Sequence, residues 1–142
     1  MKNYLKIVMN DLVRGNLRFF AGLGVILCLT SVAVGAFGAH ALNELLLANH
    51  RKEVFDLANR YHFYHGLAMI ALSATLNHVS PANNGKLLPL LFFSGTMVFS
   101  GSLYVLALSN VSWLGAITPL GGSMLIFAWC IALFYLIRTE KK

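Results

Sequence analysis

Residues 87–137 read LLPLLFFSGTMVFSGSLYVLALSNVSWLGAITPLGGSMLIFAWCIALFYLI and contain no Asp, Glu, Lys or Arg. A membrane-spanning helix needs about 20 apolar residues, so this stretch is long enough for two. The segment SNVSW at residues 109–113 interrupts it and marks the loop between them. Helices are favoured over strands because the residues do not alternate between polar and apolar, and because lipid requires every backbone group to be satisfied internally.

Two more runs, residues 19–43 and 61–85, also lack charged residues. The chain is 58% hydrophobic and 11% charged, whereas a soluble domain carries about 25% charged residues. We therefore predict an all-α integral membrane protein with four transmembrane helices in a bundle. This domain covers residues 19–142, with spans at about 19–42, 58–79, 87–109 and 115–137. Apolar residues at helical spacing predict that the second helix begins before its span, near Lys52.

The basic residues predict the orientation of these spans. With four crossings, both termini and the loop at 80–86 share one side, which holds eight of the 11 Lys and Arg residues. The other side holds Arg51, Lys52 and Arg60. Cytoplasmic loops carry the excess of Lys and Arg, so we expect a multi-pass protein of the bacterial cytoplasmic (inner) membrane with both termini in the cytoplasm. The pI of about 9.6 then reflects anchoring against anionic lipid and does not indicate nucleic-acid binding.

Residues 1–18 predict a separate element before the first span. Lys2, Lys6, Asn10 and Arg14 fall four apart, while apolar residues fall on another face. This pattern is typical of an amphipathic helix that lies in the membrane interface. We expect Gly15–Asn16 to turn it into the first span. The apolar run that follows is about 24 residues, longer than the about 7–15 of a signal peptide, so we expect it to be retained.

Polar aromatic side chains gather at matching ends of the first two spans. His40 closes the first span, and Tyr61 and His65 share one face at the start of the second. An unpaired polar group in an apolar setting costs about 1–3 kcal/mol. We therefore predict that His40, Tyr61 and His65 form one buried cluster near the outer interface. Tyr104 and Thr118 are expected on the same side, as further members of a ligand-binding site.

Four interpretations of this cluster remain open. It is a hydrogen-bonded clamp between helices, a haem or metal site, a proton relay or small-molecule pocket, or a set of independent interfacial side chains. No carboxylate falls within the spans, so we predict no metal site and no cofactor. Haem or metal held by His40 and His65 is kept as the alternative.

Small residues predict where helices approach one another closely. A stripe in the first span consists of Gly24, Cys28, Ser31, Gly35 and Gly38. Further candidates for helix packing in the third and fourth spans are Gly95, Gly101, Ser102, Gly121 and Gly122. We expect the first and third spans to meet through these residues. His40 points away from the stripe. Either the first span therefore has a second neighbour, or its last turn unwinds at Gly35–Gly38 and turns His40 inward. We expect the second neighbour, in a homo-oligomer or from a partner membrane protein.

Four segments resemble the signature of a known family. They are GAFGAHAL (35–42), YHFYHGLA (61–68), FSGSLYVLALS (99–109) and TPLGG (118–122). Their order and spacing, over about residues 19–137, are similar to those of the YgdD/YwdK-like small inner-membrane proteins of bacteria. That family is a domain of unknown function, so the resemblance implies a four-helix membrane fold and names no activity. His62 departs from the family pattern, which has glutamine there.

The sequence carries no catalytic signature. It has no P-loop, GxSxG, HExxH or CxxC motif, and no acidic residue within the predicted spans. Nothing in it therefore indicates an enzyme. We expect a small integral membrane protein with a structural or accessory role, which binds membrane lipid or a partner protein through its small-residue helix faces. The alternative is a subunit that binds or transports a small molecule, a proton or a cofactor through the His/Tyr cluster.

Overall fold

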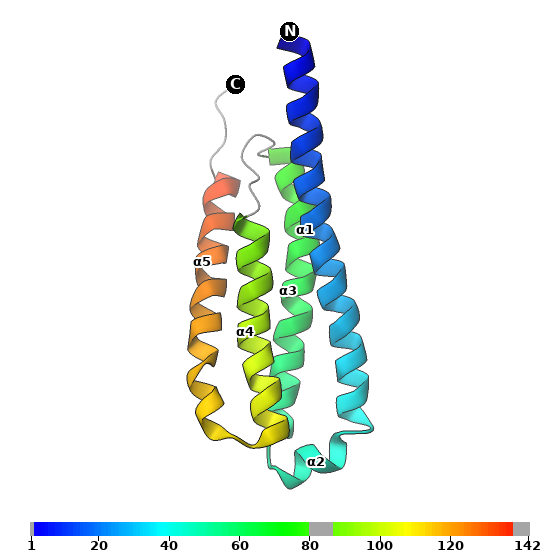
Figure 1. The fold of residues 1–142 in the computed structure, drawn as a ribbon, viewed down its shortest axis with the longest axis vertical. Helices are drawn as coiled ribbons and strands as arrows, with labels where there is room; N and C mark the ends of the chain where they lie inside the picture. Colours follow the sequence, from blue (N-terminus) through cyan, green and yellow to red (C-terminus); the bar gives the residue numbers. More distant parts are fainter. Residues whose placement is uncertain (1, 80–86, 138–142) are drawn as a thin grey trace.

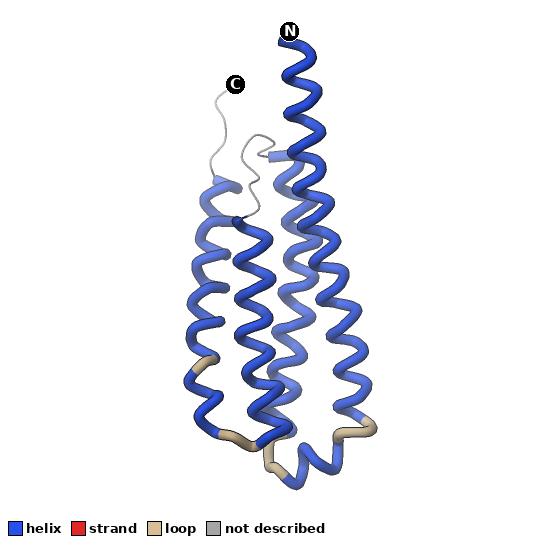
Figure 2. The backbone as a smooth tube through the Cα atoms, in the orientation of Figure 1, coloured by secondary structure: helices blue, strands red, loops and turns tan. Residues whose placement is uncertain are grey.

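The computed structural model describes the backbone of residues 2–79 and 87–137, with side chains from Leu17 to Leu76 and from Leu87 to Ile137. Within these ranges the chain is helical and has no strand (Figure 2). The four long helices are α1 (Lys2–Ala39), α3 (Lys52–Val79), α4 (Leu87–Ser109) and α5 (Thr118–Ile137). The short helix α2 (Asn43–Ala48) connects α1 to α3, and the 3-10 helix η1 (Ser112–Ala116) connects α4 to α5.

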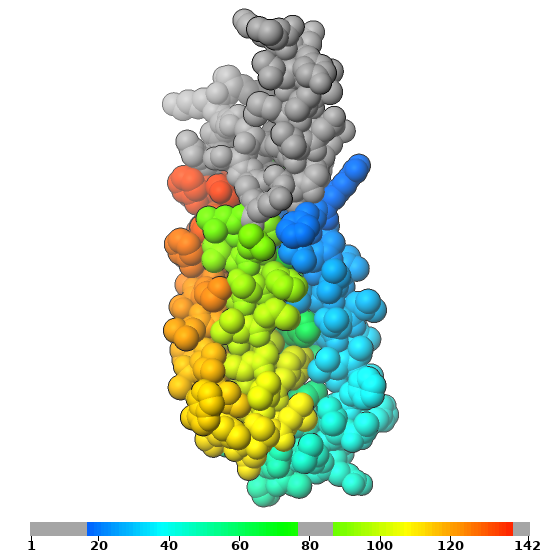
Figure 3. All heavy atoms as spheres, viewed as in Figure 1, coloured from blue at the N-terminus to red at the C-terminus, as the bar shows by residue number. Residues whose placement is uncertain are grey.

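The long helices form a curved row in which each packs on the next. Figure 1 shows the order α1, α3, α4 and α5, with chain direction reversing at each step. Helix α3 packs against both α1 and α4, and α4 packs against α5. In the described residues α1 makes no contact with α5, so the row does not close into a ring of four. On the face seen in Figure 3, the side chains of α1 and α4 largely cover α3.

Three segments are long and apolar enough to cross a membrane, namely Leu17–Ala39, Leu87–Ser109 and Ser112–Ile137. They agree with three of the four predicted spans and support a multi-pass membrane protein. The predicted span at 58–79 is not among them. It belongs to α3, which combines charged residues in its first turns with the histidines and tyrosines of the YHFYH segment. These side chains lower its mean hydropathy.

The boundaries of α3 and α4 follow the predictions. Helix α4 covers the predicted range, and α3 begins at Lys52 as expected. Helix α4 ends within the SNVSW segment, as predicted. Asn110 there has a φ of 56°, a left-handed conformation that asparagine tolerates better than most residues. The first long helix ends at Ala39, three residues before the predicted end of the first span, and α2 was not predicted.

One predicted break is absent. Helix α1 continues from Lys2 to Ala39 without a turn at Gly15–Asn16. A single glycine inside a helix costs only about 1 kcal/mol, which is small beside the unpaired backbone groups that a break leaves in an apolar setting. The location of residues 1–18 in the membrane interface stays a prediction.

Glycines bring neighbouring helices into close approach at two places. A Cβ atom on Gly24 of α1 would lie 2.6 Å from the carbonyl oxygen of Gly66 on α3. On α5, a Cβ atom on Gly121 would overlap the backbone of Phe99 on α4. In lipid, where apolar burial alone does not hold helices together, such close packing is a main source of helix association. These contacts therefore fix α1 on α3 and α5 on α4.

The lower end of the row in Figure 1 is closed by α2 and the residues that follow it. Leu46 of α2 is buried. The side-chain amide of Asn49 donates to the carbonyl oxygens of Ala107 (3.0 Å) and Leu108 (3.1 Å), which lie in the last turn of α4 and lack partners within that helix. Arg51 donates to the side-chain oxygen of Asn110 at 3.2 Å. This end of the molecule is therefore held by polar contacts across 58 or more residues of sequence.

Candidate functional site

A hydrogen-bonded network joins α1, α3 and α4 in the interior of the row. Its centre is His62 of α3, which is 4% exposed. His62 Nε2 lies 3.2 Å from the Thr30 hydroxyl of α1, and Nδ1 lies 3.4 Å from the Tyr104 hydroxyl of α4. The Tyr104 hydroxyl also donates to Asn59 Oδ1 at 3.0 Å, which in turn accepts from the Ser31 hydroxyl at 2.7 Å.

One arrangement of protons gives each of these donors an acceptor. The Thr30 hydroxyl donates to the carbonyl oxygen of Ile26 at 2.8 Å and accepts from Nε2–H of His62, and the Tyr104 hydroxyl donates to Asn59. The network then ends at an amide, which does not take up or release protons near neutral pH. Its members are thus suited to holding three helices together. Besides His62, the only titratable member among these residues is Tyr104, and a phenol does not ordinarily release its proton near neutral pH, so the arrangement is poorly suited to a proton relay.

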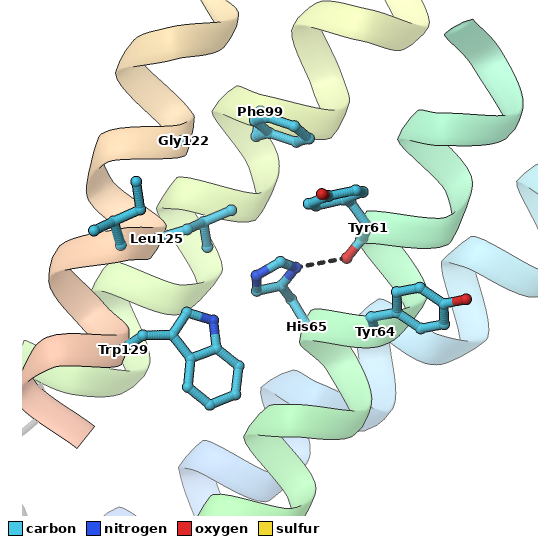
Figure 4. Close-up of a pocket in the computed structure, with 8 residues that line it drawn as sticks. Tyr61, Tyr64, His65, Phe99, Gly122, Leu125 and Trp129 are labelled. Atoms are coloured by element: carbon cyan, nitrogen blue, oxygen red, sulfur yellow. Dashed lines mark hydrogen bonds between the residues drawn. The ribbon is translucent and has the colours of Figure 1, made fainter. Parts of the chain in front are cut away.

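A separate cleft lies between α3 and α5 and is floored by α4 (Figure 4). Its volume is about 430 Å³. The lining is mainly aromatic and aliphatic, from Tyr61, Tyr64, His65, Phe99, Gly122, Leu125, Ile126 and Trp129. The cleft exists because α5 packs on α4 and meets α3 only over a short length. Gly122, on the same turn as the tightly packed Gly121, leaves space there that a side chain would fill.

His65 is the polar residue best placed in this cleft. It is 7% exposed, and its Nδ1 lies 2.8 Å from the carbonyl oxygen of Tyr61, one turn earlier on α3. Because a carbonyl oxygen only accepts, Nδ1 carries the hydrogen, and in the neutral ring Nε2 is then an acceptor. Nε2 has no hydrogen-bond partner among the described residues.

Aromatic rings hold the His65 imidazole in place. It stacks on the Tyr61 ring with centroids 5.9 Å apart, and it contacts the rings of Phe92 at 6.2 Å and Trp129 at 6.3 Å. Trp129 itself packs edge-on against Phe92. Figure 4 shows the indole nitrogen of Trp129 on the side of its ring nearer His65. That nitrogen also has no hydrogen-bond partner in the described part of the chain.

The structure distributes the predicted cluster over several places. Tyr61 and His65 lie together at the cleft, and Tyr104 belongs to the network of His62. Thr118 pairs with Ser102 at 2.9 Å, between α5 and α4.

His40 lies apart from the other members. Its side chain is exposed just past the end of α1, and within the described residues no hydrogen bond or ring contact joins it to His65. The physical reason is depth: in the antiparallel pair of α1 and α3, Gly24 lies against Gly66 and Gly38 against Phe55, so His65 lies opposite the middle of α1 and His40 lies beyond its end. The described residues also contain no group of three His, Cys, Asp or Glu side chains placed to hold a metal ion.

Most of the predicted packing residues lie between helices of this chain, but the helices that they join differ from the expected ones. The stripe of α1 faces α3: Gly35 lies against Asn59, Gly38 against Phe55, and Ser31 donates to Asn59. The expected contact of the stripe with α4 is therefore corrected: the stripe packs on α3, and in the described residues α1 meets α4 only over a short length, where the rings of Phe20 and Phe92 lie 6.1 Å apart. Gly95 faces Leu125 of α5, and Gly101 has open space in front of it.

Three residues important to these sites were missed or set aside in the sequence. Asn59 was not predicted, although it is a polar residue next to the apolar run of α3. The family resemblance does not indicate His62, because the family pattern has glutamine at its position. Trp129 lies within an uninterrupted apolar run, and only its distance of seven residues from Gly122 places both on one face of α5. Trp129 therefore carries no signal that separates it from other apolar residues.

Comparison with known proteins finds relatives of this chain. A family described as "Protein of unknown function (DUF423)" matches residues 34–122. The chain is 38% identical over 113 residues to the UPF0382 membrane protein YwdK of Bacillus subtilis, which covers 80% of this chain and 91% of that protein. It is 40% identical over 125 residues to a UPF0382 membrane protein of Staphylococcus saprophyticus, which covers 88% and 99% respectively. No solved structure matches. The matched residues include the whole of α3 and α4.

Proposed function

The chain belongs to the DUF423 family of membrane proteins of unknown function, and from this premise we propose that it is an accessory membrane protein that binds a small apolar molecule in the cleft between α3 and α5. The family resemblance seen in the sequence motifs is thereby confirmed. The observation that supports the proposal is a buried histidine, His65, whose free ring nitrogen borders an otherwise apolar cleft.

The size and lining of the cleft suit such a ligand. Small-molecule sites have volumes of about 300–1,000 Å³ and are mostly apolar, with a few polar groups that fix orientation. The cleft has a volume of about 430 Å³. Its two partner-free ring nitrogens, on His65 and Trp129, are an acceptor and a donor. A hydroxyl group both donates and accepts, so a long-chain alcohol or a hydroxyl-bearing lipid is the ligand class that fits.

The proposal includes four membrane crossings, with α3 as the fourth. Helix α3 lies between α1 and α4 (Figure 1), which both have spans long enough to cross. On α3, His62 lies in the network, and Tyr61 and His65 line the cleft; intramembrane polar residues usually face such interiors. Four crossings put the start of α1 and the end of α5 on one side, which the basic residues assign to the cytoplasm.

The role that the sequence favoured, binding lipid or a partner protein through small-residue faces, has less support than the alternative role of the His/Tyr residues. The stripe of α1 and the glycines at positions 95 and 121 are already used between helices of the same chain. The homo-oligomer, predicted because the first span needed a second neighbour, stays a prediction. The cleft, in contrast, is open space in the folded chain.

Fluorescence of Trp129 tests the proposal. The chain has two tryptophans, so Trp113→Phe leaves Trp129 as the only reporter. Purified protein in detergent is titrated with dodecanol brominated on a carbon close to its hydroxyl, so that the bromine quenches the indole beside it, and with the methyl ether of the same compound. We expect quenching by the alcohol at a midpoint about fivefold lower than for the ether, since one neutral hydrogen bond contributes about 1 kcal/mol.

The control is His65→Phe in the same single-tryptophan background. This change keeps an aromatic ring and removes the acceptor, so the preference for the alcohol should disappear. Equal quenching by alcohol and ether in the unmodified single-tryptophan protein would contradict the proposed role of His65. Absence of saturable quenching by either compound would contradict ligand binding in the cleft.

A further inference from the structure

A second cavity lies between α1 and α3, separate from the cleft. Its volume is about 300 Å³, and it is lined by Ser31, Val32, Gly35, Asn59, Arg60, Phe63 and Tyr64. We call it the α1–α3 groove. Only Tyr64 lines both cavities, so the groove offers an independent site. Its polar groups differ in kind from those of the cleft.

The orientation of the Asn59 amide sets the character of the groove. Asn59 Oδ1 accepts hydrogen bonds from Ser31 at 2.7 Å and from Tyr104 at 3.0 Å. The other end of the amide, Nδ2, is therefore turned toward Gly35, where a Cβ atom would overlap it. Both Nδ2 hydrogens lack a partner among the described residues, so the groove receives two N–H donors.

Arg60 and Tyr64 add donors to the same groove. Arg60 is exposed and has no salt bridge in the described part of the chain. A guanidinium carries five N–H donors and accepts nothing. The Tyr64 hydroxyl is also free to donate, whereas the Ser31 hydroxyl is already used by Asn59. The groove thus has a positive charge and an excess of donors, which suits the oxygens of an anion.

The surroundings of these donors point to a lipid. Val32 of α1 is 62% exposed, and Val32 and Phe63 provide apolar walls beside the donors. Arg60 lies eight residues after the start of α3, about 12 Å along the helix axis, near the end of the molecule that carries α2. A ligand with a phosphate and acyl chains meets both requirements.

We propose that the α1–α3 groove binds the headgroup phosphate of a phospholipid, with Arg60 and the Asn59 amide as donors to its oxygens. The acyl chains then lie along Val32 and Phe63. Gly35 is essential to this site because any side chain there displaces the Asn59 amide. The proposal is independent of the ligand of the α3–α5 cleft.

Native mass spectrometry of the full chain in detergent tests this site. The probes are dioleoyl phosphatidylglycerol and dioleoylglycerol, which have the same acyl chains with and without the phosphate. We expect saturable binding of one phosphatidylglycerol, and binding at least about tenfold weaker for dioleoylglycerol and for Arg60→Gln, because hydrogen bonds to charged groups are the strong ones. Equal binding of the two lipids, or an unchanged Arg60→Gln, would overturn the proposal.

Matched variants separate the site from general charge effects. Arg51→Gln removes the same charge nine residues earlier, where the side chain is held by Asn110, and should leave lipid binding unchanged. Gly35→Ala should weaken binding, whereas Gly22→Ala, on the same helix with open space in front of it, should not. Equal losses in Arg51→Gln and Arg60→Gln would mean that the lipid responds only to net charge.

Two further arms identify the source of the phosphate and separate this proposal from that of the cleft. Millimolar inorganic phosphate should not displace phosphatidylglycerol, and displacement would assign the groove to a free anion instead. His65→Phe should leave phosphatidylglycerol binding unchanged, and Arg60→Gln should leave quenching of Trp129 by the brominated alcohol unchanged. Loss of phosphatidylglycerol binding without loss of quenching, or the reverse, thus shows which of the two proposed sites fails.

Discussion

The Nδ1 atom of His65 lies 2.8 Å from the carbonyl oxygen of Tyr61, and the two rings stack at 5.9 Å. This pairing within one turn of α3 fixes both the position of the imidazole and the nitrogen that carries its hydrogen. The remaining nitrogen borders a cleft whose other walls are largely apolar. The proposed ligand binding rests on this relationship.

Close packing of α1 on α3 predicts opposite effects for two neighbouring glycines. Gly24→Ala should destabilise the protein by about 1–3 kcal/mol, because its new methyl group meets the backbone of Gly66 and overpacking carries that cost. Gly22→Ala meets nothing within 4 Å and should be neutral or stabilising by up to about 1 kcal/mol. Thermal unfolding in detergent measures both. Equal effects of the two substitutions would contradict the pairing of α1 with α3.

The buried network predicts a difference between two histidines. His62→Leu leaves Thr30 and Tyr104 without a shared partner and should cost about 1–3 kcal/mol. His40→Leu alters an exposed side chain and should change stability by less than about 0.5 kcal/mol. Unfolding by denaturant in mixed micelles ranks the two. A larger loss for His40→Leu would restore the cluster that the sequence predicted.

The same network predicts non-additive effects for His62 and Tyr104. Tyr104→Phe removes the hydroxyl that lies 3.4 Å from His62 and 3.0 Å from Asn59. Combined with His62→Leu, it should cost less than the sum of the two single changes, by at least about 0.5 kcal/mol. A double-mutant cycle provides the measurement, and strict additivity would show that the two side chains act separately.

Four crossings predict the location of the chain's ends and of α2. Reporter fusions after residue 142 should give a cytoplasmic signal, and fusions in the segment 43–51 should give an external one. The reason is that Lys and Arg are concentrated on the side of the termini. External signals from both fusions would mean that α3 does not cross, leaving the three spans at Leu17–Ala39, Leu87–Ser109 and Ser112–Ile137.

The sequence was sufficient to predict most of the fold. Long uncharged runs predicted the ranges of α4 and most of α5, and helical spacing of apolar residues placed the start of α3 at Lys52. The continuity of α1 through Gly15 was not predictable in the same way. A Gly-Asn pair favours a turn locally, but hydrogen bonding along a helix in an apolar setting outweighs that preference.

The site was predicted less well because it depends on which helices are neighbours. Tyr61 and His65 were placed together correctly, since their contact lies within one helix. Trp129 and Phe99 join them from α5 and α4, and periodicity in one segment does not reveal the pairing of helices. His40 was assigned to the cluster on the assumption that it lies at the same depth as His65. The register of α1 on α3, with Gly24 against Gly66 and Gly38 against Phe55, removes it.

Nitrogen NMR of the His65 ring tests the central claim most directly. Protein labelled with ¹⁵N-histidine is compared with His65→Phe to assign the His65 signals, and dodecanol or its methyl ether is then added. At a pH where the ring is neutral, we predict that Nδ1 carries the hydrogen, that the Nε2 signal moves on addition of the alcohol, and that the ether leaves it in place. A hydrogen on Nε2 in the free protein, or an Nε2 signal that does not respond to the alcohol, would contradict the account.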